Sequence, residues 1–444
     1  MSDWKKVKIG EIFKIEKGSL QSSKCIPGKY DFITAASEWK THESYSHECE
    51  AIVYAVAASG SLGRAHYVNG KFIASDLCFI LTEKDKEKYP INFQFYQLIF
   101  ELIREEIVSK TKTGTSKESI NQKNFSNYEI PYFSFDYQMA NYEKLVNTKQ
   151  KISELLEESE KQKSYVKQLR QNILQEAIEG KLTEEWRKEN AVVKGNPDFD
   201  AEALFERIQE EKRHTDSELL RNSKKKEKAL PEITEDEKPF EIPEGWKWVR
   251  LGEIIKDSPR NGYSPKAVDF ETPIKTLKLG AVTYGIFDAS EFKYINEEIP
   301  KDAHCWLKNG DILIERSNSI EYVGICAIYT GKDDEFMYPD LLMRFRTQDI
   351  LSKQYIHTAL ISPFNRSYFM NSAKGAQKTM PKINQDCVVN TMIPLPPLKE
   401  QDAIVNKVET LLAKVVELEK QITERETLTK QLIQSIMKDA FREE

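Results

Sequence analysis

The chain has 444 residues, of which 40% are hydrophobic and 31% are charged, so its length suits about two to four soluble globular domains. No apolar run approaches the roughly 18 residues that cross a bilayer, which excludes a membrane span, and no apolar stretch follows the first residues, which argues against a secretory signal. Because the net charge is −6, any nucleic-acid binding has to come from local basic segments.

The cysteines and histidines give no sign of a metal site. The six cysteines are far apart and form no Cys-x-x-Cys pair, so we expect free thiols in a reducing cytoplasm. His42 and His47 are five residues apart, which would place them on different faces of a helix, and we expect no metal there.

The first globular half has the signals of a mixed α/β fold. Apolar runs over 51–58 and 72–81 predict strands, and residues 93–108 predict a helix. The segment 110–123 then carries four lysines against a single acid, Glu118. Such a segment can supply the local positive charge that phosphate binding needs.

A heptad pattern follows, in which apolar residues recur every seven positions, with a second series three positions further on. This a/d pattern predicts a coiled-coil helix of about 40 residues, or roughly 60 Å. The polar members Ser159 and Gln162 would weaken a simple dimer seam but could fix its register. The expected apolar seam residues are Leu145, Ile152, Leu155, Val166, Leu169 and Ile173.

The stretch 183–240 is highly charged and separates two similar parts of the chain. Residues 200–208 have helical spacing, and the lysine-rich run 224–228 is followed by Pro231, Pro239 and Pro243. We expect a short helix and an extended linker, with the lysine run as a solvated tether rather than a DNA contact.

The second globular half repeats the signals of the first. Residues 311–315 and 323–329 predict strands, 352–370 predict a helix, and 374–382 carry three lysines and no acid. A second heptad helix closes the chain. Its expected seam residues are Val408, Leu411, Val415, Leu418, Leu432 and Ile436.

The chain is therefore an internal duplication. Residues 4–12 match 246–254 at an offset of 242, and from Ile120-Asn121-Gln122 to Ala177 the offset to the second copy is 263. The second half thus has about 21 extra residues between its matched ends. Each heptad helix could pair with another chain, but two equal units favour mutual antiparallel pairing about a pseudo-two-fold axis.

Motifs for catalysis are missing. The closest match to a methyltransferase Asn-Pro-Pro-aromatic motif is Asn196-Pro197-Asp198-Phe199, which lacks the second proline. Gly331-Lys332 is followed by Asp333, so it is not a phosphate loop. A nuclease-like pairing of Pro197-Asp198 with Glu210-Glu211-Lys212 is a match that a Glu/Lys-rich linker gives by chance.

The remaining candidates are polar loops at matched places in the two halves. Small hydroxyl residues and glycine let a backbone approach phosphate, lysines neutralise it, and Asn, Gln and Arg can bind base edges. The candidates in the first half are Ser59, Ser61, Arg64, Lys112, Thr113, Gly114, Thr115, Lys117, Asn121 and Gln122. Those in the second half are Arg316, Ser317, Asn318, Lys374, Gly375, Gln377, Lys378, Asn384 and Gln385.

Each of these loops could also be an ordinary solvated surface loop. Asn121 and Asn384 in particular are equally suited to cap a helix or form a turn. Their paired placement in both halves favours the nucleic-acid interpretation.

These motifs resemble those of type I restriction-modification specificity subunits. The resemblance rests on Trp-x-x-Val-x-[Ile/Leu]-Gly-Glu-Ile at residues 4–12 and 246–254, on Glu241-Ile-Pro-Glu-Gly-Trp246, on the run from Ile393-Pro394 to Gln401, and on the run from Leu169 to Lys181. It spans essentially the whole chain. Residues 130–134 depart from the usual Pro-Pro-Leu, so the first helix is expected to begin irregularly.

The resemblance implies an α+β fold with two tandem mixed α/β target recognition domains and two long helices packed as an antiparallel coiled coil. Each domain would read one half of a split double-stranded DNA site, and no catalytic centre would be present. The implied divisions are recognition domains at 1–137 and 246–397, helical regions at 138–182 and 398–444, and a charged helix and linker at 183–245.

The resemblance also implies partners. The helices would dock two adenine-N6 methyltransferase subunits, and motor-nuclease subunits would join them. S-adenosylmethionine, ATP and Mg²⁺ would bind those partners and not this chain. The residues leave two rival interpretations open, a divergent DNA-modifying enzyme and a coiled-coil adaptor with no DNA role.

Overall fold

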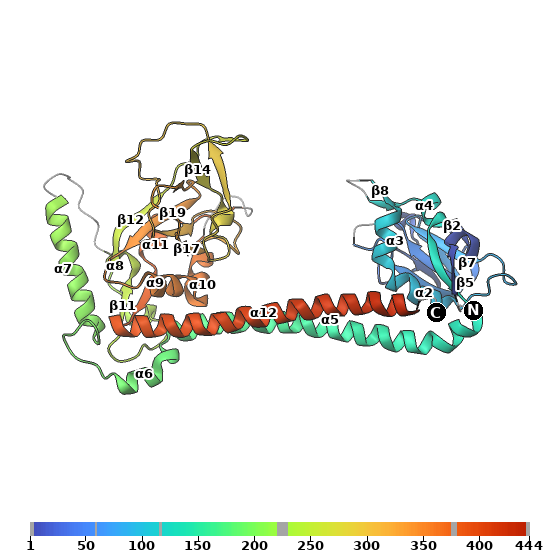
Figure 1. The fold of residues 1–444 in the computed structure, drawn as a ribbon, viewed down its shortest axis with the longest axis horizontal. Coiled ribbons are helices and arrows are strands. Elements are labelled where there is room, and N and C mark those ends of the chain that lie inside the picture. Colours follow the sequence, from blue (N-terminus) through green and yellow to red (C-terminus); the bar gives the residue numbers. More distant parts are fainter. Residues whose placement is uncertain (1–3, 58–59, 115–117, 220–229, 374–379, 441–444) are drawn as a thin grey trace. The chain divides into compact units, whose positions relative to one another are not determined.

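The computed structural model describes residues 4–57, 60–114, 118–219, 230–373 and 380–440 (Figure 1). The chain divides into two compact units, Met1–Gln162 with Gln421–Glu444, and Lys163–Lys420. The first half, from strand β1 to strand β10, lies in the first unit. The second half, from strand β11 to strand β20, lies in the second.

The first half is built on one six-stranded sheet with the order β2-β7-β5-β6-β3-β4. Its elements are β1 (Trp4–Lys8), α1 (Ile9–Ile12), β2 (Phe13–Lys17), η1 (Ser22–Lys24), β3 (Tyr30–Ile33), β4 (Lys40–His42), β5 (His47–Ala55), β6 (Ala65–Ala74), β7 (Cys78–Glu83), α2 (Phe93–Leu102), α3 (Arg104–Thr111), β8 (Lys112–Thr113), β9 (Ser119–Ile120), α4 (Gln122–Asn127) and β10 (Glu129–Phe133).

The central strand β5 explains why an uninterrupted apolar run forms a strand here. Ile52 and Tyr54 belong to one core cluster, which includes the buried rings of α2, whereas Ala51, Val53 and Ala55 belong to a second cluster. Since successive side chains of a strand point to opposite faces, β5 is buried on both faces. The apolar run therefore continues without the polar alternation of a half-exposed strand.

The second half contains two four-stranded sheets, β12-β19-β16-β17 and β13-β15-β14-β18. Its elements are β11 (Lys247–Arg250), α8 (Leu251–Ile254), β12 (Ile255–Asn261), β13 (Ala267–Val268), β14 (Ile274–Leu277), η4 (Leu279–Ala281), β15 (Phe292–Ile295), β16 (Ile312–Glu315), β17 (Cys326–Ile328), β18 (Phe336–Met337), β19 (Leu342–Thr347), α9 (Lys353–Ile361), α10 (Pro363–Ser372), α11 (Gln385–Val389) and β20 (Met392–Leu395).

The duplicated framework is visible in the strand pairings. β2-β7-β5-β6 and β12-β19-β16-β17 have the same order and pairing directions. In both halves the first strand pairs antiparallel with the last, β1 with β10 and β11 with β20. The offset rises from 242 at the start of β2 and β12 to 260 at Ala55 and Glu315. Most of the extra residues therefore precede β16, in the segment that forms the separate sheet.

Three predicted elements are divided in the structure. The single strand predicted over 72–81 is wrong, because Ser75, Asp76 and Leu77 separate β6 from β7. In that turn Cys78 N–H donates to the Ser75 carbonyl at 2.9 Å, and Leu77 N–H donates to Ser75 Oγ at 3.2 Å. A side chain that accepts from a nearby backbone N–H is the usual way in which serine favours a turn.

The helices predicted over 93–108 and 352–370 are each two helices, α2 with α3 and α9 with α10. The second break has a clear cause. Ser362 caps α10 by accepting from Asn365 N–H, and Pro363 is its first residue. Proline has no backbone N–H to continue the hydrogen-bond ladder of α9, but it fits the first position of a new helix.

Two long helices follow the two halves, α5 (Phe135–Ile178) and α12 (Leu398–Ala440). Phe135 and Leu398 are related by the offset of 263, so the two helices begin at matched residues and the irregular start expected for the first one is not observed. Within the second unit, Thr183 Oγ1 donates to Glu400 at 2.7 Å and Arg170 pairs with Glu419 at 3.1 Å. From Arg170 to Thr183 the residue number rises, while that of the contacted residue falls from Glu419 to Glu400. The two long helices therefore run antiparallel.

A buried glutamine joins each long helix to its own half. Gln138 Oε1 accepts from the N–H of Asn92, the cap of α2, at 2.7 Å, and its Nε2 donates to Phe133 at 2.9 Å. Gln401 makes the matching bonds, at 3.0 Å from the N–H of Ser352 and at 2.9 Å to Pro396. Both side chains are fully buried, so each helix leaves its half in a direction fixed by these bonds.

The heptad positions differ in burial. The first series is buried, whereas the second series has side chains that are 41% to 49% exposed. Two helices alone cover mainly the line of closest approach and leave its flank open. The buried residues are Ile152, Val166, Ile173, Val408 and Val415, and the exposed ones are Leu155, Leu169, Leu418 and Leu432. Leu411 is half-buried, Leu145 packs on the core of the first half, and the side chain of Ile436 lies outside the described residues.

The charged stretch contains η2 (Lys181–Thr183), α6 (Glu184–Glu189), α7 (Ala201–Leu219) and η3 (Glu235–Glu237). Leu398 N–H donates to the Pro197 carbonyl at 3.1 Å, and Lys212 Nζ donates to the Gly252 carbonyl at 2.9 Å. The described part of this stretch is therefore packed against its own unit and is not an extended tether. The lysine run 224–228 lies outside the described residues.

All six cysteines are free thiols, and burial raises the pKa of Cys78 to about 12. None of the helices in the described parts of the chain combines the length and the apolar character needed to cross a bilayer.

Candidate nucleic-acid interface

Two loops that are distant in the sequence meet in the second half. The loop after β16 begins with Arg316 and Ser317, and a β-bridge joins Ser317 to Lys382. Beside this bridge, Ile383 N–H donates to the Arg316 carbonyl at 3.0 Å. The pairing places Arg316 and the exposed Lys382 on adjoining segments.

The first half repeats this arrangement. A β-bridge joins Ala57 to Ser119, and Ile120 N–H donates to the Val56 carbonyl at 2.8 Å. Ser119 and Lys382 are related by the same offset of 263 that relates the helices. The loop after the central strand and the segment before Ile-Asn-Gln thus adjoin in both halves.

In the first half, several candidate side chains are held by local partners. Arg64 Nη1 donates to the Ala35 carbonyl at 2.8 Å and to Ser61 Oγ at 3.2 Å. Lys112 pairs with Glu118 at 2.6 Å, and Thr113 Oγ1 donates to the Ser119 carbonyl at 3.3 Å. Gly114 has a φ of +90°, a conformation that glycine adopts readily. Arg64 is thus a brace inside its half, whereas Lys112 and Thr113 remain exposed.

The Ile-Asn-Gln residues act mainly in the backbone structure. Asn121 caps α4 by accepting from Lys123 and Asn124 N–H, and Asn384 caps α11 by accepting from Cys387 N–H at 2.8 Å. Gln122 Nε2 donates to the Ile15 carbonyl at 3.2 Å, and Gln385 is exposed. The capping alternative therefore describes both asparagines in this structure.

In the second half a buried carboxylate organises the loop after β16. Glu315 is fully buried, and it accepts from Asn318 Nδ2 and from Thr283 Oγ1, both at 2.6 Å. Burial raises the pKa of the Glu315 carboxyl, although these two donors act against that shift. Arg316 Nη1 donates to the Asp340 carbonyl at 3.3 Å, and Ser317 is fully buried. Ser317 thus supports the loop, while Arg316 and Asn318 are partly accessible.

Seven candidates fall where placement is too uncertain to describe. Ser59, Thr115, Lys117, Lys374, Gly375, Gln377 and Lys378 lie outside the described residues. The neighbours that are described, Gly114 and Met380, are exposed.

One exposed turn escaped the sequence analysis. The side chains of Tyr284 and Ile286 are 82% and 73% exposed, although their neighbour Phe287 packs its ring 4.9 Å from that of Tyr329. Thr283 holds the other end of the turn through its bond to Glu315, so the turn adjoins the loop after β16. Its only signal in the sequence is that it lies among the extra residues of the second half.

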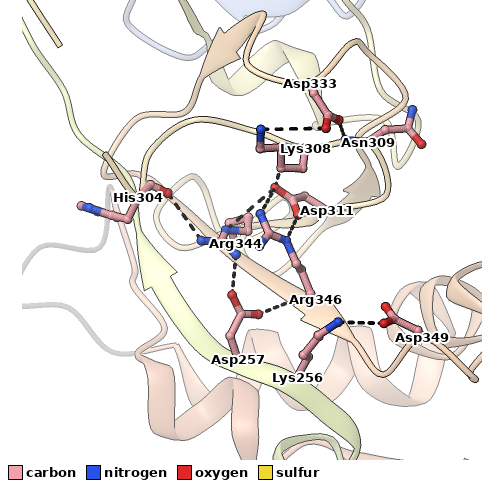
Figure 2. A network of polar contacts seen from close by, with 10 residues as sticks. All are labelled: Lys256, Asp257, His304, Lys308, Asn309, Asp311, Asp333, Arg344, Arg346 and Asp349. Atoms are coloured by element: carbon pink, nitrogen blue, oxygen red, sulfur yellow. Dashed lines mark hydrogen bonds and ion pairs between the residues drawn. The ribbon is translucent and has the colours of Figure 1, made fainter. Parts of the chain in front are cut away.

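A buried ionic cluster supports the same half. Figure 2 shows Arg344 between the carboxylates of Asp257 and Asp311, with Arg346 bonded to Asp311. The Arg344 and Asp311 side chains are 5% and 1% exposed. The hydrogen bond that Arg346 donates to the Asp311 carboxylate raises the pKa of Arg346. These charges pair with one another across β12, β19 and the start of β16, so the cluster stabilises the sheet.

Among the described residues, no group of three or more His, Cys, Asp or Glu side chains is placed to hold a metal ion. His42 and His47 are bound within the strands of the first half. His42 Nδ1 accepts from Ile26 N–H at 3.1 Å, and His47 Nε2 lies 3.1 Å from Glu16.

Comparison with known proteins places this geometry in a family. The family model for the type I restriction modification DNA specificity domain matches residues 1–174 and 243–425. The specificity subunit of the type I restriction enzyme EcoEI of Escherichia coli is 30% identical over 276 residues, covering 61% of this chain and 44% of that protein. The chain therefore spans less than half the length of that relative. The EcoDI specificity subunit of Escherichia coli is 26% identical over 446 residues, covering 100% of this chain and 88% of that protein.

A solved structure shares the fold. A chain from a structure that concerns complex assembly and conformational transition of the type I R-M system matches with a TM-score of 0.60 and 16% identity. The match covers 99% of this chain and 98% of that chain.

Proposed function

Because the chain belongs to the family of type I restriction-modification specificity subunits, which are non-catalytic, we propose that each half reads one part of a split DNA sequence. The observation that carries this proposal is the repeated pair of adjoining loops, at Ala57 with Ser119 and at Ser317 with Lys382. Two readers built on one framework suit a site with two parts, because each can vary its own contacts.

The chemistry of the loops supports DNA as the ligand. Lys112, Arg316 and Lys382 supply positive charge for phosphate, and the neighbouring Thr113 and Asn318 supply hydrogen-bonding groups. The surrounding charge of the chain is negative, so affinity concentrates where these cations gather. Residues 374–378 and 115–117 remain candidates on their sequence alone.

The long helices are proposed to set the gap between the two half-sites and to dock partner subunits. Their exposed leucines form two matched pairs under the offset of 263, Leu155 with Leu418 and Leu169 with Leu432. Since the duplication presents the same apolar strip twice, two copies of one partner can bind in equivalent ways. We assign these positions to two adenine-N6 methyltransferase subunits.

The remaining chemistry belongs to those partners. S-adenosylmethionine would bind the methyltransferase subunits, and ATP and Mg²⁺ would bind motor-nuclease subunits that join the complex. Such a complex acts on DNA in the cytoplasm. This chain would supply the choice of sequence and the spacing.

Co-expression of the chain with its methyltransferase partner, followed by genome-wide mapping of methylated adenines, tests the proposal. We expect a two-part sequence with a constant gap. DNA binding by the assembled complex should also weaken steeply with salt, since phosphate contacts release counterions. Methylation without a two-part sequence would overturn the proposal. Binding of S-adenosylmethionine by the isolated chain would favour a modifying enzyme, and weak, salt-insensitive DNA binding would favour an adaptor.

A further inference from the structure

In each half, one arginine donates hydrogen bonds to backbone carbonyls of the loop that follows the central strand. In the second half, Arg366 on α10 donates from Nη1 to the Val323 carbonyl at 2.7 Å and from Nη2 to the Glu321 carbonyl at 3.0 Å. One guanidinium thus binds two carbonyls that are two residues apart, so it fixes the direction of the backbone between them.

The first half has the same contact. Arg104, the first residue of α3, donates from Nε to the Leu62 carbonyl at 2.8 Å and from Nη2 to the Gly60 carbonyl at 3.2 Å. Leu62 and Val323 are related by an offset of 261, as are Gly60 and Glu321. The loops themselves share almost no sequence, so the contact belongs to the framework and not to the loop.

In each half, a glycine at the end of this loop lies against the helix that carries the arginine. Gly63 and Gly324 have φ values of +81° and +77°, and their N–H groups donate to the last residues of β5 and β16, Ala55 and Glu315, at 2.8 and 2.7 Å. A Cβ on Gly324 would lie 2.5 Å from the Phe369 side chain. The helix therefore lies directly behind the loop, and the glycine permits that approach.

The loop is thus fixed on two sides. The β-bridge from Ser317 to Lys382 holds its first residues, and Arg366 holds its last residues. Between these attachments, Ser319 and Ile320 are exposed and Asn318 is partly exposed. A loop that is fixed at its edges presents its exposed side chains in one geometry and loses little entropy on binding.

We propose that Arg104 and Arg366 are positioning residues, each of which holds the reading loop of its own half in the shape that discriminates bases. This inference rests on the proposed function. The Arg366 guanidinium is largely buried, and burial lowers its pKa. The arginines act through the loop, and the exposed loop residues contact the DNA.

The experiment uses the full chain in complex with its methyltransferase partner and compares Arg104→Ala, Arg366→Ala and Arg366→Lys by sequencing of methylated sites. We expect Arg366→Ala to lower discrimination about tenfold at one or more base pairs of one half-site, the size of a lost base contact, with the other half-site unchanged. Arg104→Ala should lower discrimination at the other half-site and leave the first one unchanged. Arg366→Lys can satisfy one carbonyl and should give a smaller loss at the same half-site. Arg207→Ala, on the exposed face of α7, is the matched control and should change neither.

A second measurement separates positioning from folding. Hydrogen exchange of the amides in 316–324 should quicken in Arg366→Ala, while exchange in β16 and β19 stays slow. Lower methylation at all sites with an unchanged sequence would reflect general destabilisation and would overturn the proposal. So would weaker binding to all sequences with a shallower salt dependence, because that identifies a phosphate contact. If the alanine variant fails to fold, the lysine variant decides. If the wild-type complex methylates no two-part sequence, the proposed function fails instead.

Discussion

The two halves of the chain share their edges and differ in their middles. Each half closes by pairing its first strand with its last, and each joins its long helix through a buried glutamine. Between these edges the first half adds β3 and β4 to its one sheet, whereas the second half builds a separate sheet from β13, β15, β14 and β18. The comparison teaches that the parts that set geometry are duplicated, while the segment before the loop that follows the central strand differs between the halves.

The difference extends to the core. Strand register equates Asp311 and Arg344 with Ala51 and Ile80 of the first half. Ala51 and Ile80 are as deeply buried as Asp311 and Arg344. One framework is therefore stabilised by an ionic cluster in one copy and by apolar packing in the other.

Breaking the ionic cluster should have the largest effect. Asp311→Ala removes the buried acceptor of Arg346 and of the Lys308 N–H and leaves Arg344 paired with Asp257. Removal of one partner of a buried ionic cluster costs up to about 3–5 kcal/mol. Urea unfolding of the full chain should show this loss in the second half. The corresponding change in the first half is Ala51→Gly. It leaves no buried charge without a partner, so it should lower the free energy of unfolding far less.

The converse change sharpens the comparison. Asp311→Ala and Arg344→Ile together copy Ala51 and Ile80 of the first half, and they should restore most of the stability that Asp311→Ala removes, because apolar packing can replace a buried ion pair. A double variant less stable than Asp311→Ala would show that the two cores are not interchangeable.

The glutamine joints should have an intermediate effect. Gln138→Leu leaves the Asn92 N–H without its acceptor, and Gln401→Leu does the same to Ser352, each at a cost of about 1–3 kcal/mol. Hydrogen exchange should rise near α2 in one variant and near α9 in the other. Gln150→Leu, at an exposed position of α5, is the control. Equal responses in all three variants would contradict a joint specific to each half.

The smallest effect concerns pH. Burial lowers the pKa of His357, whose Nε2 lies 3.0 Å from the Cys326 carbonyl, and Gln97 donates to Ala65 in the same place of the first half. Because the folded chain favours the neutral ring, the stability that it contributes is complete above the unfolded pKa of about 6.5 and is lost as pH falls below it.

His357→Gln should remove that dependence. Between pH 7 and 5.5 the wild-type chain should lose up to about 1 kcal/mol more stability than the variant, measured by urea unfolding at both pH values. An equal loss in the two proteins would mean that His357 does not titrate in this range.

The sequence predicts the framework well because the framework is local and repeated. The matched Trp-to-Ile runs, the heptads and the apolar run of β5 each carry their own periodicity. The division of 72–81 into two strands is harder to foresee, since Ser75 breaks the run through bonds to its own backbone.

The site is less predictable because its determinants act over distance. Arg104 binds carbonyls more than 40 residues away, and carbonyls have no side-chain signature. Conversely, Asn121 and Asn384 fit both base reading and capping, and only the structure shows that their side chains accept from helix N–H groups. The sequence identifies the polar segments that are candidates for the site. The tertiary structure shows which contacts each side chain makes.

Exchange of one half tests the central claim most directly. Residues 1–135 are replaced by those of a relative with a different DNA site, the hybrid is co-expressed with the methyltransferase partner, and methylated adenines are mapped. The account predicts that one half-site changes to that of the relative, while the other half-site and the gap stay as they were. A hybrid that keeps the whole original sequence, or changes both half-sites, would contradict independent reading by the two halves.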